Sequence, residues 1–230
     1  MRQGISLFLC PVPAIGNGLL SALMAGLHGA ERQRARCFSC VEALHLFVVA
    51  HAALHWALRR AGVEGYRFAC APQGKPYLVD HPDLQFNLSH TKGLIAVALG
   101  ADHPIGVDVE RLATPQTYRE LAPRVMTPAE CAYMAAQAGA EDRFTQLWAA
   151  KEALMKATGL GFGLPPREIE FDGPAANLCR LPPEHGAPQD WQIWCQRLPG
   201  HWLALASQAT QLADRPLQPI TLSPQDLLLP

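Results

Sequence analysis

The alternation of apolar and polar residues divides the chain into stretches that predict helices and strands. Residues 30–60 contain no glycine or proline and are rich in alanine and leucine, so they predict one long helix. Arg59, Arg60 and Gly62 provide its C-terminal end. Residues 66–100 instead alternate short β-prone runs (YRFAC, LQFNLSH, GLIAVAL) with turns, and predict strands.

A second set of elements follows in the C-terminal part of the chain. The stretch TPAE at residues 127–130 has the pattern of a capping box with proline at the first helical position, and predicts the start of a helix. Another helix is expected from about Glu141 to Thr158, with Gly159 as its C-terminal cap. Short strands separated by prolines should follow, and the proline-rich tail from Asp214 predicts a loose arm.

The predicted strand IGVDVE carries two carboxylates on one face. Side chains alternate along a strand, so Ile105, Val107 and Val109 face one way and Asp108 and Glu110 face the other. The two acids then lie about 6.6 Å apart along the strand, at about 3.3 Å per residue. Like charges this close favour a cation between them, and oxygen ligands suit Mg²⁺. The alternative is a half-buried strand with a solvated outer face.

The predicted helix in residues 142–159 contains a lysine where an apolar residue is expected. Lys151 lies in the middle of an apolar arc, so it must be buried or reach into a cleft. Glu152 and Lys156 could simply form an i,i+4 pair on the surface. Taken with the two acids of the strand, these residues predict a site in which acids hold a divalent cation and lysines hold phosphates.

Composition limits the classes of partner. The formal net charge is -1, with 19 basic and 20 acidic residues, which argues against a nucleic-acid partner. No run reaches the ~18 consecutive apolar residues of a membrane span, so no membrane partner is expected. Seven scattered cysteines suit a reducing compartment, and we expect a cytoplasmic protein. Cys37 and Cys40 form a C-x-x-C pair, and His51 and His55 have i,i+4 spacing, but both pairs lack companion residues and packing roles are favoured.

Four motifs in order resemble a known family. IGVDVE at 105–110 and WAAKEALMK at 148–156, preceded by GKP at 74–76 and FNLSHT at 86–91, are similar to the signature of the 4′-phosphopantetheinyl transferases of the surfactin-synthetase-activating type. The resemblance implies a Mg²⁺-dependent enzyme, with Mn²⁺ as the alternative metal. Such an enzyme transfers 4′-phosphopantetheine from its co-substrate coenzyme A to a serine of an apo acyl or peptidyl carrier protein and releases 3′,5′-ADP. It would serve fatty acid, polyketide or nonribosomal peptide synthesis.

The resemblance also assigns roles to residues. It implies that Asp108, Glu110 and Glu152 are the metal ligands, and that Asp108, Glu152 and Lys156 are catalytic, with Glu152 taking the serine proton. His45 stands where the family often has an arginine. The residues implied to hold coenzyme A are Arg36, His45, Lys75, Ser89, His90, Lys151 and Lys156.

The fold implied by the resemblance is α+β, with two similar halves related by a pseudo-twofold axis within one chain. We place the N-terminal half at residues 1–104 and the C-terminal half, which carries the metal-binding motifs, at residues 105–230. The site would lie at their junction, and the chain would be a monomer. A non-catalytic module that binds carrier protein or coenzyme A is the alternative function.

Overall fold

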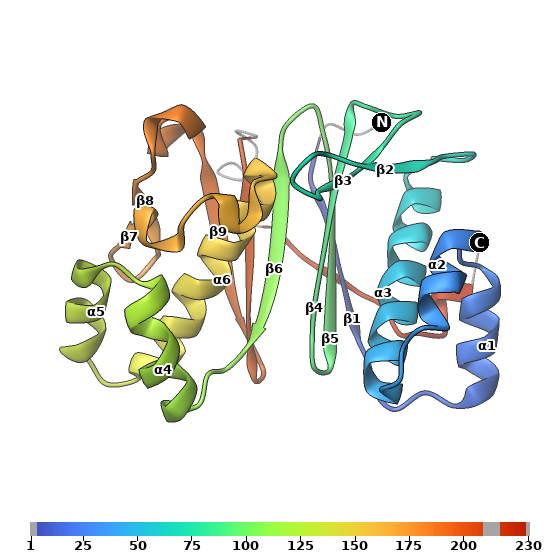
Figure 1. Cartoon of the computed structure of the whole chain (residues 1–230), viewed down its shortest axis with the longest axis horizontal. Helices are drawn as coiled ribbons and strands as arrows, with labels where there is room; N and C mark the ends of the chain where they lie inside the picture. The colour runs from blue at the N-terminus through green and yellow to red at the C-terminus, as the bar shows by residue number, and fades with distance from the viewer. Residues whose placement is uncertain (1–3, 209–216, 229–230) are drawn as a thin grey trace.

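The computed structural model describes residues 4–208 and 217–228. Two sheets face each other in the middle of the molecule, and helices cover the outer side of each sheet (Figure 1). Helices and strands are thus mixed in each half, and the predicted α+β class is confirmed.

The N-terminal half begins with a strand and three helices. They are followed by a short hairpin and a long antiparallel hairpin, and the strand order in the main sheet is β11-β1-β5-β4. The elements are β1 (Ser6–Pro11), α1 (Asn17–Ala25), α2 (Gly29–Ala35), α3 (Val41–Arg60), β2 (Phe68–Cys70), β3 (Pro76–Leu78), β4 (Leu84–Thr91) and β5 (Leu94–Ala101).

The C-terminal half repeats this order of elements. Its sheet order, β6-β10-β9, corresponds to β1-β5-β4 of the first half, as two similar halves require. The division between residues 104 and 105 stays a prediction. The elements are β6 (Ile105–Arg111), α4 (Pro115–Val125), α5 (Pro128–Ala135), α6 (Ala140–Thr158), β7 (Glu170–Asp172), β8 (Asn177–Arg180), β9 (Gln192–Leu198) and β10 (His201–Ser207). The 3-10 turns of this half are Gly161–Gly163, Pro166–Glu168, Pro183–His185 and Pro188–Asp190.

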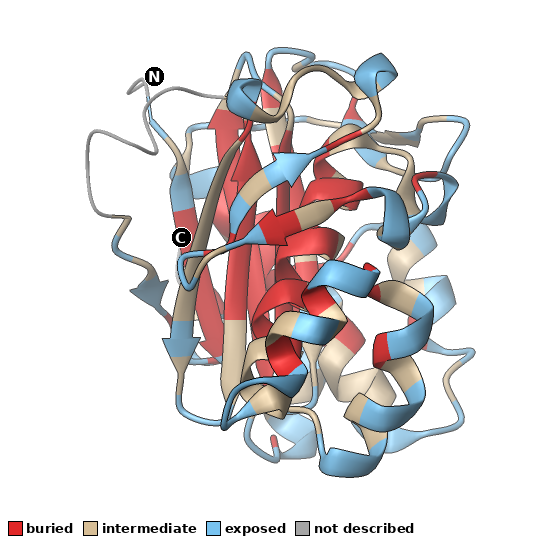
Figure 2. Ribbon diagram, turned by 90° about the vertical axis from the view of Figure 1, so that its left-hand side faces the viewer, coloured by how far each residue is buried: buried red, intermediate tan, exposed pale blue. Residues whose placement is uncertain are grey.

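The core consists of three apolar layers, one within each half and one between the two sheets. The alternation of side chains along β1 sends Phe8 toward α3 and Leu7 toward the opposite sheet. Val107 of β6 and Leu203 of β10 meet Leu7 in the layer between the sheets. Each apolar side chain buried in this way contributes about 1.5–3 kcal/mol. Figure 2 shows the central strands largely buried, whereas peripheral strands and the outer faces of the helices are exposed.

The prediction of one long helix over residues 30–60 is wrong in one respect, because the structure divides this segment into two helices, α2 and α3. Residues 36–40 separate α2 from α3, and Cys40 is extended at the start of α3. The break allows α2 to fold back over α3, so that the Glu31 carboxylate reaches His51 and His55. His51 and His55 lie 20 and 24 residues after Glu31 in the sequence. Helix propensity is a local property, so it cannot indicate ion pairs between such distant residues.

The loose arm predicted from Asp214 is also wrong over residues 217–228, whereas residues 214–216 lie outside the described residues. The strand β11 (Ile220–Thr221) pairs in parallel with β1, and the 3-10 turn η6 (Asp226–Leu228) follows it. Leu222 and Leu227 are buried in the N-terminal core. Residues 217–228 therefore pack against the first half of the molecule, as the red segment of Figure 1 shows.

The helix α3 is long and apolar enough, by length and composition, to cross a membrane. More than half of its most apolar window is buried in the N-terminal core, however. A core helix passes the same test, so this is weak evidence for a membrane span.

Candidate functional site

The candidate site lies where the two sheets meet, between β4 and β6. One edge of β6 pairs with β10, whereas the other edge is bridged by side chains of β4. The amide of Val107 donates to Asn87 Oδ1 at 2.8 Å, and the amide of Val109 donates to Ser89 Oγ at 3.4 Å. These contacts hold β6 in register against the N-terminal half and place Ser89 beside Asp108.

Gly106 brings helix α6 directly onto β6. A Cβ atom at this position would lie 2.0 Å from the Ala153 carbonyl oxygen and 2.4 Å from the Ala157 nitrogen, so only glycine fits. Asp108 and Glu110 follow on the same face of the strand. The close approach therefore sets these two carboxylates against Glu152 of α6.

Three carboxylates gather at this contact. One oxygen each from Asp108, Glu110 and Glu152 lies within 4.8 Å of the other two. Asp108 is buried, and its Oδ1 accepts hydrogen bonds from Ser89 Oγ at 2.8 Å and from Lys156 Nζ at 2.5 Å. Its Oδ2 is also buried, but has no hydrogen-bond partner among the described residues. A buried carboxylate oxygen without a partner is costly unless a cation binds it.

The pKa values of the cluster report the same crowding of negative charge. Burial raises the pKa of Glu110 to about 7, and the neighbouring Asp108 and Glu152 raise it further, against an opposing hydrogen bond from Trp148. Burial also raises the pKa of Glu152 to about 7, with Asp108 adding to the shift and Lys156 opposing it. All three donors are oxygens, so the residues fit a hard divalent cation such as Mg²⁺.

Lys156 supplies the positive charge of the site. Its Nζ lies 2.5 Å from Asp108 Oδ1, 3.0 Å from Ser89 Oγ and 3.7 Å from Glu152 Oε2. The side chain is 28% exposed, so the ammonium group touches the acidic cluster and solvent at once. It is therefore placed to meet an anionic group that approaches the cluster.

Lys151 does not belong to the site, and its predicted role in coenzyme A binding does not fit this position. The side chain is fully buried, and its Nζ donates to Glu130 Oε2 at 2.6 Å and to three backbone carbonyls. Glu130 also closes the capping box of α5. The sequence signalled that cap, but not the ion pair, because the two residues are far apart in the chain. The carbonyls belong to Val125, Pro166 and Ile169.

Lys75 crosses from the first half to the second. Its Nζ donates to the carbonyl oxygens of Ile105, at 3.0 Å, and Ala157, at 2.9 Å. Burial lowers the pKa of Lys75 to about 8. The ammonium group thus ties the β2–β3 hairpin to β6 and α6, and its predicted contact with the phosphates of coenzyme A stays a prediction.

The other residues predicted to hold coenzyme A lie on β4, near the start of α3 and at the end of α2. His90 follows Ser89 on β4, and its pKa is lowered by burial and then by the charge of Lys156. His45 is partly exposed near the start of α3, and Arg36 is exposed after α2. Because no described contact joins Arg36 or His45 to the acidic cluster, the structure leaves their role as a prediction.

Comparison with known proteins identifies a family domain in the C-terminal half. Residues 104–208 match the 4′-phosphopantetheinyl transferase superfamily (ACPS). The chain is 32% identical over 148 residues to a 4′-phosphopantetheinyl transferase of Bacillus subtilis. It is 28% identical over 214 residues to a putative 4′-phosphopantetheinyl transferase of Synechocystis, covering 87% of this chain and 85% of that protein. Residues 104–208 therefore carry a 4′-phosphopantetheinyl transferase superfamily domain, and the similarity to such transferases extends into the N-terminal half. The resemblance drawn from the four motifs is thereby confirmed.

Coverage differs among these transferase relatives. The match to the Bacillus subtilis protein spans 62% of this chain and 65% of that protein. The transferase Sfp of Bacillus subtilis strain 168 is 36% identical over 101 residues, which span 43% of this chain and 44% of Sfp. A solved holo-[acyl-carrier-protein] synthase of Thermotoga maritima has 20% identity and a TM-score of 0.37, covering 45% of this chain and 61% of that one. That similarity is too low to carry an argument.

Proposed function

We propose that this chain transfers 4′-phosphopantetheine from coenzyme A to a serine of an apo carrier protein and releases 3′,5′-ADP. The proposal rests on one observation above all, the buried and unpartnered Oδ2 of Asp108 among the carboxylates of Glu110 and Glu152. An oxygen-only cluster next to a lysine suits a metal-bound diphosphate. The match of residues 104–208 to the 4′-phosphopantetheinyl transferase superfamily supports the same reaction.

Asp108, Glu110 and Glu152 would hold Mg²⁺, or Mn²⁺ as the alternative metal. When bound, such an ion supplies positive charge to the oxygens of the diphosphate. Ser89 and Lys156 both hydrogen-bond Oδ1 of Asp108 and leave Oδ2 for the ion. The chain thus fixes the orientation of its most buried ligand before any substrate arrives.

Glu152 and Lys156 have the positions needed for the transfer itself. The serine oxygen forms a bond to the phosphorus that carries pantetheine, and the bond from that phosphorus to the 3′,5′-ADP oxygen breaks. Glu152 is partly exposed at the rim of the cluster, 3.7 Å from Lys156 Nζ, so it is placed to take the serine proton, directly or through water. Lys156 would stabilise the negative charge that develops on the departing phosphate.

The carboxylate oxygens of the acidic cluster do not indicate which carrier protein is the substrate. We propose an apo acyl or peptidyl carrier protein from fatty acid, polyketide or nonribosomal peptide synthesis as the partner. Because the repeated element order already places two halves side by side in one chain, we propose a monomer, and the scattered cysteines support a cytoplasmic location.

Intact-mass spectrometry tests the reaction directly. Apo carrier proteins of the three pathway types are incubated with the chain, coenzyme A and Mg²⁺, and parallel samples receive EDTA. A mass gain of one phosphopantetheine group that disappears in EDTA is the expected result. Coenzyme A binding without any mass gain on every carrier would contradict the proposal, and would favour the non-catalytic binding module instead.

A further inference from the structure

A second cluster of ligand-type side chains lies in the N-terminal half, away from the acidic cluster. It joins the loop before α2, the first turn of α2 and the middle of α3. One donor atom each from His28, Glu31 and His55 lies within 4.8 Å of the other two. Neither the proposed transfer reaction nor the coenzyme A residues use these three side chains.

The carboxylate of Glu31 is the centre of this cluster. Its Oε2 lies 2.7 Å from His55 Nε2 and accepts the backbone amide of His28 at 2.8 Å. The imidazole ring of His28 packs against that of His55, with centroids 4.6 Å apart. Two imidazoles and one carboxylate therefore converge from three different segments of the chain.

Neighbouring groups fix the orientation of two of these side chains. His51 Nδ1 lies 2.6 Å from Glu31 Oε1, and the Tyr66 hydroxyl hydrogen-bonds Nδ1 of His55. His55 Nε2 and Glu31 Oε2 consequently stay turned toward His28. Metal-binding histidines and carboxylates commonly have such outer partners, which set the tautomer and hold the ring in place.

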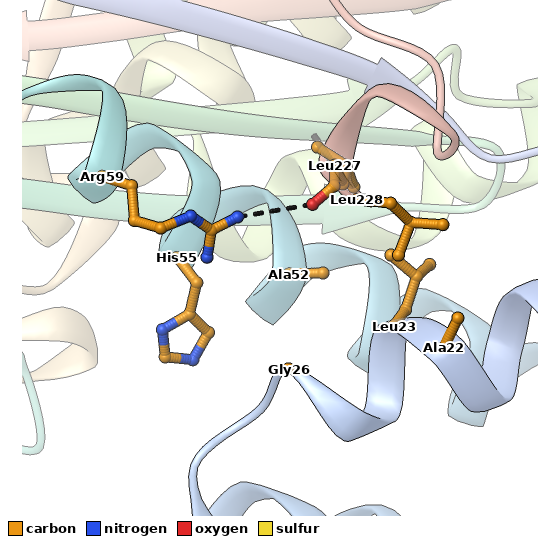
Figure 3. A pocket seen from close by; sticks show the side chains of 8 residues that line it. All are labelled: Ala22, Leu23, Gly26, Ala52, His55, Arg59, Leu227 and Leu228. Atoms are coloured by element: carbon orange, nitrogen blue, oxygen red, sulfur yellow. Dashed lines mark hydrogen bonds between the residues drawn. The ribbon is translucent and has the colours of Figure 1, made fainter. Parts of the chain in front are cut away.

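Of the three cluster residues, His55 lines a surface cavity of about 400 Å³. Its wall is formed by α1, α3 and η6, and Figure 3 shows the imidazole of His55 projecting from α3 on the side away from Leu227 and Leu228. Arg59 does not enter the cluster, because its guanidinium donates to the Leu227 carbonyl oxygen at 3.4 Å. An ion can therefore approach His55 from solvent.

We propose that His28, Glu31 and His55 form a second metal site, selective for a borderline transition-metal ion such as Zn²⁺. Two nitrogens and one oxygen match the ligand preference of Zn²⁺, whereas the all-oxygen cluster at Asp108 matches Mg²⁺. Three protein ligands leave a fourth position for water. The ion would replace the proton shared by His55 Nε2 and Glu31 Oε2, and that proton is released to solvent. It would tie α2 to α3 across the break at residues 36–40.

Cobalt titration of the full chain tests the site, because four-coordinate Co²⁺ absorbs visible light much more strongly than six-coordinate Co²⁺. The experiment uses metal-stripped protein carrying Glu110→Gln and Glu152→Gln, so that the acidic cluster contributes no signal. One equivalent of Co²⁺ should produce a strong visible band, and one equivalent of Zn²⁺ should abolish it. Zn²⁺ should also raise the melting temperature, and above its dissociation constant the rise should follow the logarithm of the free Zn²⁺ concentration.

Variants of the ligand residues distinguish a metal site from a cluster that is held only by hydrogen bonds. His28→Gln and Glu31→Gln should each weaken Co²⁺ binding at least tenfold, whereas His103→Gln in the β5–β6 turn should not change it. Glu31→Gln also removes the partner of His51 and His55, so circular dichroism must show a folded protein. His28 lies at the surface, so His28→Gln should fold normally. This variant therefore tests metal binding even if Glu31→Gln does not fold. Absence of a stoichiometric band, or Co²⁺ binding by both ligand variants as tight as that of the parent protein, would overturn the proposal.

Discussion

Lys151 and Glu130 form an ion pair of 2.6 Å in which both side chains are almost wholly shielded from solvent. Oε2 of Glu130 also accepts the amide of Thr127, and Oε1 accepts the amide of Phe171. The pair therefore joins α6, the start of α5 and β7 in one fully bonded network. Such a network stabilises only when every member has its partner.

Removing one member of this pair should destabilise the fold without touching the acidic cluster. Lys151→Met should lower the free energy of unfolding by about 3–5 kcal/mol, because Glu130 would keep a buried charge without its partner. Urea denaturation followed by circular dichroism measures the loss. The exposed Lys92→Met serves as control and should change stability little. A wild-type unfolding midpoint for Lys151→Met would contradict this account.

Replacing Gly106 should damage the packing of α6 on β6. An alanine Cβ would overlap the carbonyl of Ala153, so Gly106→Ala must push the helix away from the strand. We expect a lower melting temperature together with loss of phosphopantetheine transfer, since Glu152 moves with the helix. Gly16→Ala is the matched control, because nothing lies within 4 Å of its added methyl group. Equal melting temperatures for the two variants would show that the helix adjusts freely.

Glu152→Gln should abolish transfer while largely keeping the fold. The amide has nearly the same size, but cannot take a proton and binds a cation poorly, so a loss of at least about 10²-fold is expected. Initial rates from intact-mass spectrometry provide the measurement. Glu141→Gln, in the first turn of the same helix, should retain wild-type rates. Unchanged transfer rates in Glu152→Gln would contradict both roles assigned to Glu152, that of metal ligand and that of base.

Asp108→Asn should weaken the metal-dependent binding of coenzyme A. The change removes the charge of the one carboxylate that offers a buried, unpartnered oxygen. Calorimetric titration with coenzyme A, with Mg²⁺ and with EDTA, measures the effect. Asn retains the size of Asp, so circular dichroism should stay unchanged. Identical affinities for wild type and variant in Mg²⁺ would exclude Asp108 as a ligand.

The metal-free protein should lose stability as the pH rises from about 4.5 to above 7. Glu110 and Glu152 have pKa values raised to about 7 from 4.5, so the folded state binds more protons than the unfolded chain within this window. Their contribution is present below pH 4.5 and is lost as the pH rises through 7. Melting temperatures in EDTA at several pH values measure it. Mg²⁺ should oppose the loss above pH 7, and the Glu110→Gln, Glu152→Gln protein should show a smaller pH dependence.

Local sequence patterns were sufficient to place Asp108 and Glu110 on one face of a strand and Glu152 on a helix. Period-two alternation depends only on neighbouring residues, and here it held. The partner of Lys151 could not be found in this way, because Glu130 lies 21 residues earlier and meets it only through packing. The break between α2 and α3 carries no glycine or proline, and is favoured by contacts of Glu31 with the distant His51 and His55. Tertiary contacts therefore determine both the partner of Lys151 and the break between α2 and α3.

The return of residues 217–228 to the first half means that the two halves cannot be separated by a single cut of the chain. The outermost strand of the N-terminal sheet, β11, is made last in the sequence, and Leu227 completes the core beneath α3. A fragment that ends at residue 104 would expose the free edge of β1 and the apolar surface that Leu222 and Leu227 cover. During synthesis, the half that is made first must therefore wait for residues 217–228 before its core is complete.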